Sequence, residues 1–147
     1  DGRVYQHEHG ARGGDELNRL VSGRNYGWPV ITHGVDYNGA RITPYTEMPG
    51  MEQPLVHWTP SIAPSGLARY DGDAFPAWRG DLFVGALAAR SVRRLELADG
   101  RVVARHEMFT ELDARIRDVR VGPDGFIYLL TDADDGRVLR IRPAAES

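Results

Sequence analysis

Short strands separated by turn signals fill the second half of the chain and constrain its fold more than any other feature. Apolar or alternating segments predict strands at residues 82–86, 92–97, 101–109, 117–121, 126–130 and 137–141. Between two of them, Asp99-Gly100 supplies the positive φ angles that a tight hairpin requires. Strands of about five residues, with turns every ~8–12 residues, indicate an all-β sandwich, barrel or propeller.

The order of elements near the C-terminus favours the propeller. Residues 126–130 are apolar on both faces, which predicts a buried inner strand. A strand, a Pro-Asp-Gly turn, an apolar strand, an Asp-Gly turn and a further strand are typical of a propeller blade of roughly 40–50 residues. The 147 residues would make about three blades. Because propellers usually have about four to eight, we expect a fragment of a larger ring.

Composition removes several function classes. All 18 basic residues are arginine, so Schiff-base and P-loop lysine chemistry are excluded. The absence of cysteine excludes disulfides, thiolate metal sites and a cysteine nucleophile. A net charge of -3 argues against a nucleic-acid partner, and no apolar run approaches the ~20 residues that cross a bilayer. With 41% hydrophobic residues the chain can bury a core.

The first half is rich in glycine and in groups that bind metals. We expect one helical turn at residues 15–20 and a long irregular stretch at residues 34–60. His7 and His9 lie two apart, so on a strand they would share a face and could bind zinc or iron. The alternative is a strand-end cap and a solvated loop residue. Calcium could instead be bound by carbonyls of the glycine-rich loop together with Asp15 or Glu16.

Two later segments could bind a ligand. Arg115 and Arg117 lie two apart and, on an extended segment, would point their guanidinium groups the same way, which suits carboxylates or phosphates. The alternative is a solvated pair bridged to Asp113 or Asp118. Trp58 and Ser61 lie in a segment fixed by two prolines, where the indole ring is either a sugar platform or core.

Several of these segments, in this order, carry a family resemblance. Residues 9–18 (HGARGGDELN) and 23–29 (GRNYGWP) resemble the glucose/sorbosone dehydrogenase family, soluble quinoproteins that use pyrroloquinoline quinone (PQQ). Residues 58–66, 80–87 and 115–125 are similar to later segments of that family. The resemblance is greatest to the bacterial aldose sugar dehydrogenase branch. It implies an all-β, six-bladed propeller of which this chain, residues 1–147, supplies about the last three blades of a single domain.

The resemblance also implies residue roles. Main-chain carbonyls of Gly10 and Ala11 would bind the Ca²⁺ that contacts PQQ, although the family usually has proline at the second position. A second, structural Ca²⁺ would use Glu16 and Tyr26. Arg115 and Arg117 would hold the acidic cofactor. Ser61 would contact the cofactor as well, and Trp58 would lie beside it.

One departure from the family pattern concerns a lysine that the soluble glucose dehydrogenase branch places against PQQ. Ala88 stands at that position, so cofactor binding is expected to be weaker unless Arg90 reaches in. The family's catalytic histidine comes from an earlier blade and is expected upstream of this chain.

The implied activity is oxidation of aldose sugars at C1, with hydride transfer to PQQ assisted by Ca²⁺. An external electron acceptor, a periplasmic or secreted location and the rest of the propeller would complete the system. Two other functions stay open: a propeller without cofactor that binds a protein partner, and a calcium-stabilised carbohydrate-binding propeller with Trp58 as platform.

Overall fold

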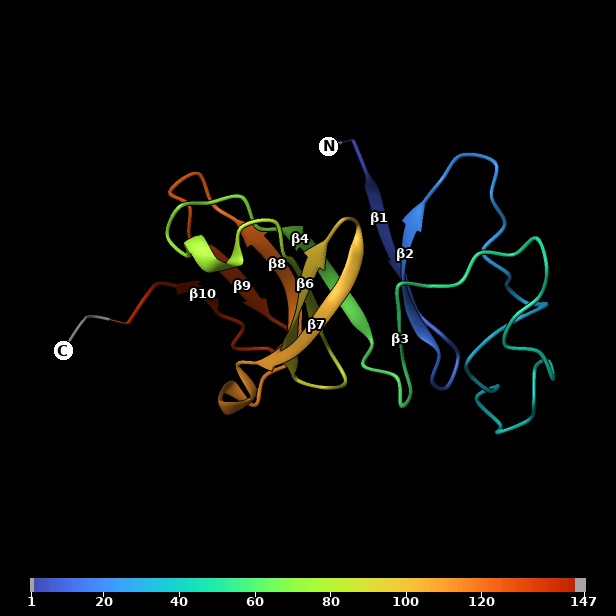
Figure 1. Ribbon diagram of the computed structural model, residues 1–147. Helices are drawn as coiled ribbons and strands as arrows, with labels where there is room; N and C mark the ends of the chain where they lie inside the picture. Colours follow the sequence, from blue (N-terminus) through green and yellow to red (C-terminus); the bar gives the residue numbers. More distant parts are fainter. Residues whose placement is uncertain (1, 145–147) are drawn as a thin grey trace. The chain divides into compact units, whose positions relative to one another are not determined.

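The computed structural model describes residues 2–144, and within them every regular element is a strand or a short 3-10 turn. The ten strands form three antiparallel sheets of three, four and three strands. Contacts divide the chain into two compact units, residues 1–64 and residues 65–147. The first unit holds one sheet and the second holds two (Figure 1).

The first unit is built on a hairpin with a third strand added from a distant segment. β1 (Val4–Glu8) pairs with β2 (Asp15–Leu20), and β2 pairs with β3 (Val56–Trp58). The predicted helical turn at residues 15–20 is therefore wrong. A helix this short is marginal by itself, whereas strand pairing on both sides satisfies the backbone of β2. The irregular stretch between β2 and β3 agrees with the prediction for residues 34–60 except at β3.

Three of the four strands in the four-stranded sheet of the second unit were predicted from the sequence, and the first, β4, was not. The sheet runs in the order β4 (Pro64–Arg69), β5 (Leu82–Ala86), β6 (Ser91–Ala98) and β7 (Arg101–Met108). β6 and β7 form the expected hairpin, and both turn residues have positive φ, 51° at Asp99 and 75° at Gly100. The Asp-Gly pair therefore has the conformation for which the turn needs it.

The second sheet of this unit contains β8 (Ile116–Val121), β9 (Ile127–Thr131) and β10 (Val138–Ile141), with β9 in the middle. The predicted inner strand is confirmed, because β9 is paired on both sides and Ile127 and Leu129 are fully buried. Two 3-10 turns, η1 (Pro76–Trp78) and η2 (Thr110–Leu112), lie in the connections.

One apolar cluster holds the second unit together. It combines Tyr70, which directly follows β4, with buried residues from both sheets of the unit: Phe83, Val92, Ile116, Val119, Ile127 and Leu129. Tyr70 also uses its hydroxyl, which donates to the Gly125 carbonyl at 2.8 Å and accepts from the Phe75 N–H at 2.9 Å. The buried hydroxyl is therefore satisfied both as a donor and as an acceptor, and its directional hydrogen bonds fix the position of Tyr70 in an otherwise apolar core.

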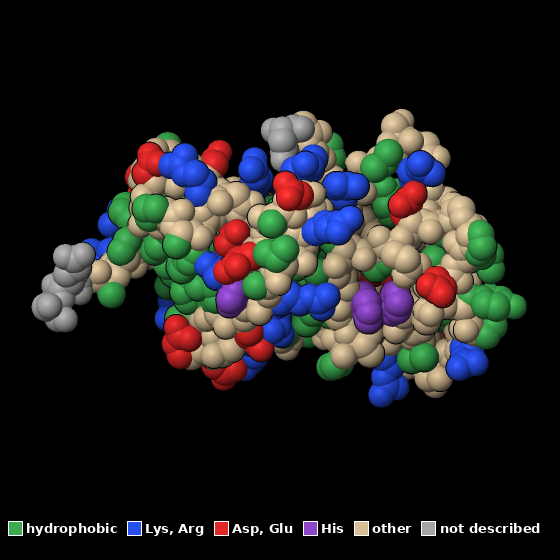
Figure 2. Space-filling view, in the orientation of Figure 1, with side chains coloured by type: hydrophobic (Ala, Val, Ile, Leu, Met, Phe, Trp, Pro, Cys, Tyr) green, Lys and Arg blue, Asp and Glu red, His purple; other side chains and the backbone are tan. Residues whose placement is uncertain are grey.

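No helix among residues 2–144 has the length and apolar character that a membrane crossing requires. On the face in Figure 2, arginine and acidic side chains are interspersed.

Candidate functional site

The glycine-rich loop between β1 and β2 is folded tightly onto itself. A Cβ at Gly10 would meet the Gly13 carbonyl oxygen at 2.0 Å, so no larger residue fits without moving the backbone. Gly13 and Gly14 both have positive φ, at 78° and 74°. These glycines permit a close turn that brings the carbonyl oxygens of Gly13 and Gly14 next to Gly10.

The side chain of Asp15, at the end of this loop, holds it in place through hydrogen bonds. Its Oδ1 accepts from the Gly10 N–H at 2.8 Å and from the Ser61 hydroxyl at 3.0 Å. Its Oδ2 accepts from the N–H groups of Ile62 at 2.7 Å and Ala63 at 2.9 Å. A carboxylate that is 1% exposed and accepts four hydrogen bonds is a structural group. Of the two acidic residues expected to bind calcium, Asp15 is thus already engaged within the protein.

Glu16 is in a different situation. It lies opposite Glu8 across the β1–β2 pair, and Asn18 Nδ2 donates to both carboxylates, at 3.0 Å to Glu8 and 3.4 Å to Glu16. We call Glu8, Glu16 and Asn18 the acidic cluster. Burial raises the pKa of Glu16, and the negative charge of Glu8 raises it further, against the lowering effect of the Asn18 hydrogen bond and of His33.

Asn18 leaves an oxygen without a partner in this cluster. The residue is 1% exposed, and none of residues 2–144 donates a hydrogen bond to its Oδ1. A buried, unsatisfied amide oxygen is costly, and two adjacent carboxylates add to that cost. The acidic cluster therefore has the chemistry of a site that a hard cation would complete.

A pocket of about 200 Å³ opens beside the acidic cluster. Residues from both ends of the β1–β2 loop and from the segment that follows β2 line it: Glu8, His9, Gly10, Gly14, Glu16, Tyr26, Trp28, Ile31 and Thr32. Three of the four residues expected to bind metal, Gly10, Glu16 and Tyr26, thus share one pocket, while Ala11 does not line it. Within residues 2–144, no group of three or more His, Asp or Glu side chains is arranged to hold a metal ion. Any metal bound here would need main-chain or amide oxygens as well.

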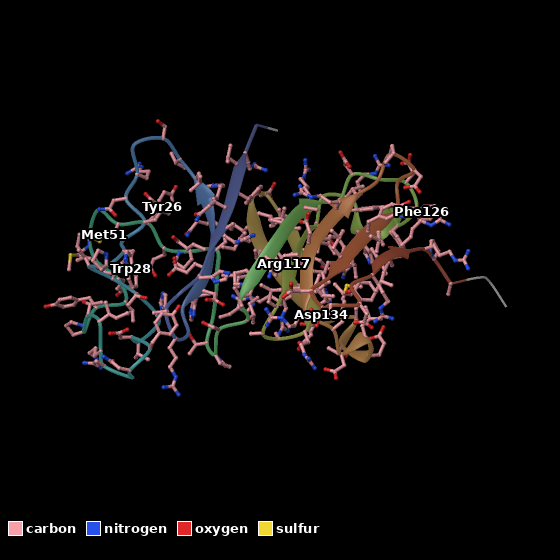
Figure 3. The ribbon with its side chains drawn as sticks, turned by 180° about the vertical axis from the view of Figure 1, so that it is seen from behind. Tyr26, Trp28, Met51, Arg117, Phe126 and Asp134 are labelled. Atoms are coloured by element: carbon pink, nitrogen blue, oxygen red, sulfur yellow. The ribbon has the colours of Figure 1, made fainter. Side chains whose placement is uncertain are left out.

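Tyr26 contributes its hydroxyl to the structure of the loop that follows β2. The hydroxyl donates to the Arg19 carbonyl at 2.9 Å and accepts from the Val21 N–H at 2.7 Å. Its main-chain carbonyl is then the group that Tyr26 can offer to an ion. Figure 3 shows Tyr26 and Trp28 on this loop near Met51, and the bridge between Asn25 and Met51 holds the two segments together.

The remaining predicted residues of this unit support the loop. Ser61 accepts from the Gly13 N–H at 2.8 Å besides its bond to Asp15. Trp58 lies in β3 with its ring half-buried, and its carbonyl accepts from the Gly14 N–H at 2.8 Å. His7 belongs to β1, whereas His9 lies beyond its end and its Nε2 donates to the Pro64 carbonyl at 2.6 Å. The two histidines therefore do not share one strand, as the zinc or iron hypothesis required.

The second unit holds the arginine pair. Arg115 Nε donates to Asp132 Oδ2 at 2.9 Å, and Arg117 Nη2 lies 3.1 Å from the same oxygen. We call Arg115, Arg117 and Asp132 the arginine clamp. The hydrogen bonds from Arg115 and then Arg117 lower the pKa of Asp132, so the carboxylate is ionised at neutral pH.

The partner of the pair differs from both acidic residues considered in the sequence. Asp113 pairs with Arg90 at 2.8 Å and Asp118 with Arg120 at 2.8 Å. Asp132 lies in the connection between β9 and β10. No sequence signal linked it to residues about fifteen positions earlier; only the pairing of β8 with β9 brings them together. Ala88, at the position of the expected family lysine, is exposed.

Comparison with known proteins identifies the family. The family model described as Glucose / Sorbosone dehydrogenase matches residues 1–140. The chain belongs to the glucose/sorbosone dehydrogenase family. It is 42% identical to aldose sugar dehydrogenase YliI of Escherichia coli (strain K12) over 142 residues, which is 95% of this chain and 38% of the relative.

Solved structures of the family agree. A glucose dehydrogenase crystal structure superimposes with a TM-score of 0.92 at 48% identity, covering 97% of this chain and 42% of its own. The PQQ-bound aldose sugar dehydrogenase of Streptomyces coelicolor gives a TM-score of 0.68 at 26% identity, covering 95% of this chain and 40% of its own. The expected fold class, an all-β six-bladed propeller of which this chain supplies about three blades, is confirmed. The chain spans about two fifths of the length of these relatives.

Proposed function

We propose that this chain is the calcium- and PQQ-binding portion of a quinoprotein that oxidises aldose sugars at C1, in a single propeller domain. The observation that carries the proposal is the arginine clamp, because two guanidinium groups gathered at one exposed position suit a ligand with several carboxylates. Family membership and the PQQ-bound relative support PQQ as that ligand.

The residues present fit an acidic cofactor. Each guanidinium has five N–H donors, and the described bonds to Asp132 use one from Arg115 and two from Arg117. Most donors therefore remain for a ligand. Fixed positive charge also stabilises negative charge that develops on a bound group during reduction. Arg115 and Arg117 would thus both hold the cofactor and favour its reduced form.

The acidic cluster and the adjoining loop fit calcium. The unpartnered Asn18 oxygen, two carboxylates and the carbonyls of a loop that only glycine permits are all hard oxygen donors. Gly10 and Ala11 would offer carbonyls to the ion beside the cofactor, and Glu16 and Tyr26 would hold a structural ion. Ser61 would support this loop through Gly13 and Asp15, with Trp58 flanking the cofactor.

When bound, PQQ supplies the carbonyl that accepts hydride and Ca²⁺ the Lewis acid that polarises it. The residues of this chain orient these groups, while the general base that takes the sugar hydroxyl proton is a histidine expected elsewhere in the complete protein. A periplasmic or secreted location and an external electron acceptor belong to the same proposal.

Reconstitution tests the proposal. The complete protein, loaded with PQQ and Ca²⁺, should oxidise glucose in a dye-linked assay. The double variant Arg115→Ala/Arg117→Ala should bind PQQ at least about 100-fold more weakly, since two charge-assisted contacts are lost. Arg120→Ala is the matched control, because Arg120 lies on β8 with Arg117 and pairs with Asp118. No turnover with any aldose, or equal PQQ binding by the double variant, would contradict the proposal.

A further inference from the structure

Arg117 occupies an irregular position in its strand. Ile116 pairs with Thr131 and Asp118 with Leu130, so Arg117 is an extra residue that has no partner on β9. Ile116 and Val119, three residues apart, are both fully buried, which shows that the inward phase of β8 shifts here. Such β-bulges re-aim a side chain, and in this strand the side chain is one of the two predicted cofactor ligands.

Asp132 meets both arginines at this bulge. Its N–H donates to the Arg115 carbonyl at 2.8 Å, which fixes its own backbone against that of Arg115. Its side chain then reaches Arg115 Nε at 2.9 Å, and Arg117 at both Nε (3.4 Å) and Nη2 (3.1 Å). One carboxylate is therefore bonded to both guanidinium groups, through the Nε atom of each and through Nη2 of Arg117.

Without such a partner the two side chains would be disordered before a ligand arrives. The side chains of Arg115 and Arg117 are 43% and 53% exposed, and arginine has many rotamers to lose on binding. A carboxylate that already holds both lowers that entropic cost. The same carboxylate also carries a negative charge, which opposes the binding of an acid.

We infer that Asp132 is the positioning residue of the arginine clamp: it holds Arg115 and Arg117 side by side in the orientation in which they receive an acidic ligand. This inference rests on the proposed function for the nature of the ligand, but the ordering of the arginines is a property of the protein alone. Asp132 has two opposing effects on the affinity for an acidic ligand. If its ordering of the arginines dominates, its removal weakens binding; if its negative charge dominates, its removal strengthens binding.

The surroundings provide a matched control. A cavity of about 200 Å³ borders the clamp and is lined by six charged residues, among others: Arg90, Asp113, Arg115, Asp132, Asp135 and Arg137. Asp135 lies three residues after Asp132 in the same turn and lines the same cavity, yet none of the described ion pairs of the clamp involves it. Asp135→Asn therefore removes the same charge from the same cavity without removing a bond to the clamp.

The experiment compares the complete protein with its Asp132→Asn and Asp135→Asn variants. In protein labelled with ¹⁵N-arginine, the Nε–H signals of Arg115 and Arg117, assigned through Arg→Lys variants, should be lost or broadened in Asp132→Asn and kept in Asp135→Asn. PQQ titration should give about tenfold weaker binding for Asp132→Asn, and equal or slightly tighter binding for Asp135→Asn.

Two outcomes would overturn the inference. If the Nε–H signals persist in Asp132→Asn, this residue does not order the arginines. If Asp132→Asn binds PQQ as tightly as the parent protein or more tightly, which is the result expected for Asp135→Asn, then Asp132 acts only as a competing anion. Failure of the parent protein to bind PQQ would count against the proposed function instead, and the arginine signals alone would then decide the role of Asp132.

Discussion

The acidic cluster and the arginine clamp satisfy their charges in opposite ways. In the acidic cluster, two carboxylates share one amide, the Asn18 oxygen is buried without a partner, and burial raises the pKa of Glu16. In the arginine clamp, one carboxylate is bonded to two cations near solvent, and those bonds lower the pKa of Asp132. The first arrangement lacks positive charge and the second has a surplus of it. A cation would relieve the first and a polyanion the second.

The largest expected effect concerns the anchor beneath the loop of the first region. Asp15→Ala should lower the free energy of unfolding by about 3–5 kcal/mol, because a buried carboxylate and the four bonds it accepts are lost together. Urea unfolding of the complete protein measures this. Asp36→Asn, at a half-buried position of the same unit, should change stability by less than about 0.5 kcal/mol. A loss of under 1 kcal/mol for Asp15→Ala would show that the loop does not depend on this anchor.

Calcium should act on the first region and leave the second unaffected. Saturating Ca²⁺, at about 100 times its dissociation constant, should stabilise the protein by about 2.7 kcal/mol, which corresponds to a rise in Tm of a few degrees. Thermal unfolding with and without EGTA provides the measurement.

Glu16→Gln tests whether that stabilisation comes from the acidic cluster. The variant should lose most of the rise in Tm, since the amide cannot supply a charged oxygen. Glu52→Gln, at a position paired with Arg24 in the same unit, should keep it. Full retention of the calcium effect in Glu16→Gln would remove the acidic cluster from consideration as the structural ion site.

Much of the second unit follows from sequence alone, and the reason is local. The Asp99-Gly100 turn and the alternation in β6 are encoded within a few residues, as is the apolar run of β9. The β2 strand was missed because its six residues carry no decisive local preference, and pairing with β1 and β3 decides their conformation. Candidate ligands could be named by resemblance to the family, but what holds them in place could not.

The supporting groups were missed for one physical reason. Asp15 bonds to residues 61–63 and Asp132 to Arg115 and Arg117, in each case across a long separation in sequence. The bulge at Arg117 is likewise a property of the β8–β9 register. Side chains that orient other side chains carry no motif, because their partners are set by strand pairing.

Mild acidification should leave the arginine clamp intact, because the pKa of its carboxylate is lowered, whereas the pKa of Glu16 in the acidic cluster is raised. The pKa of Asp132 in the folded protein lies below its usual value of 3.8, so the contribution of the arginine clamp is complete above that value and is lost as the pH falls through the lower, folded pKa. The charged groups that face it are Arg90, Asp113, Asp135 and Arg137, and the pH interval from 7 to 5 lies wholly above the lowered pKa of Asp132. The Nε–H signals of Arg115 and Arg117 should therefore be unchanged over that interval, and a transition within it would show that another group controls the clamp.

The smallest expected effect on stability is that of Asp132→Asn, a substitution that should affect binding and not folding. Asp132→Asn should change the free energy of unfolding by no more than about 0.5 kcal/mol, because ion pairs of exposed groups contribute little to stability. The same substitution is expected to weaken PQQ binding, so the two measurements should dissociate. For Asp15→Ala we expect them to move together, since the loop that it anchors is both structural and a candidate ion site. If Asp132→Asn proved as destabilising as Asp15→Ala, the clamp would be part of the folded framework, and its effect on binding would follow from lost structure instead of lost arginine order.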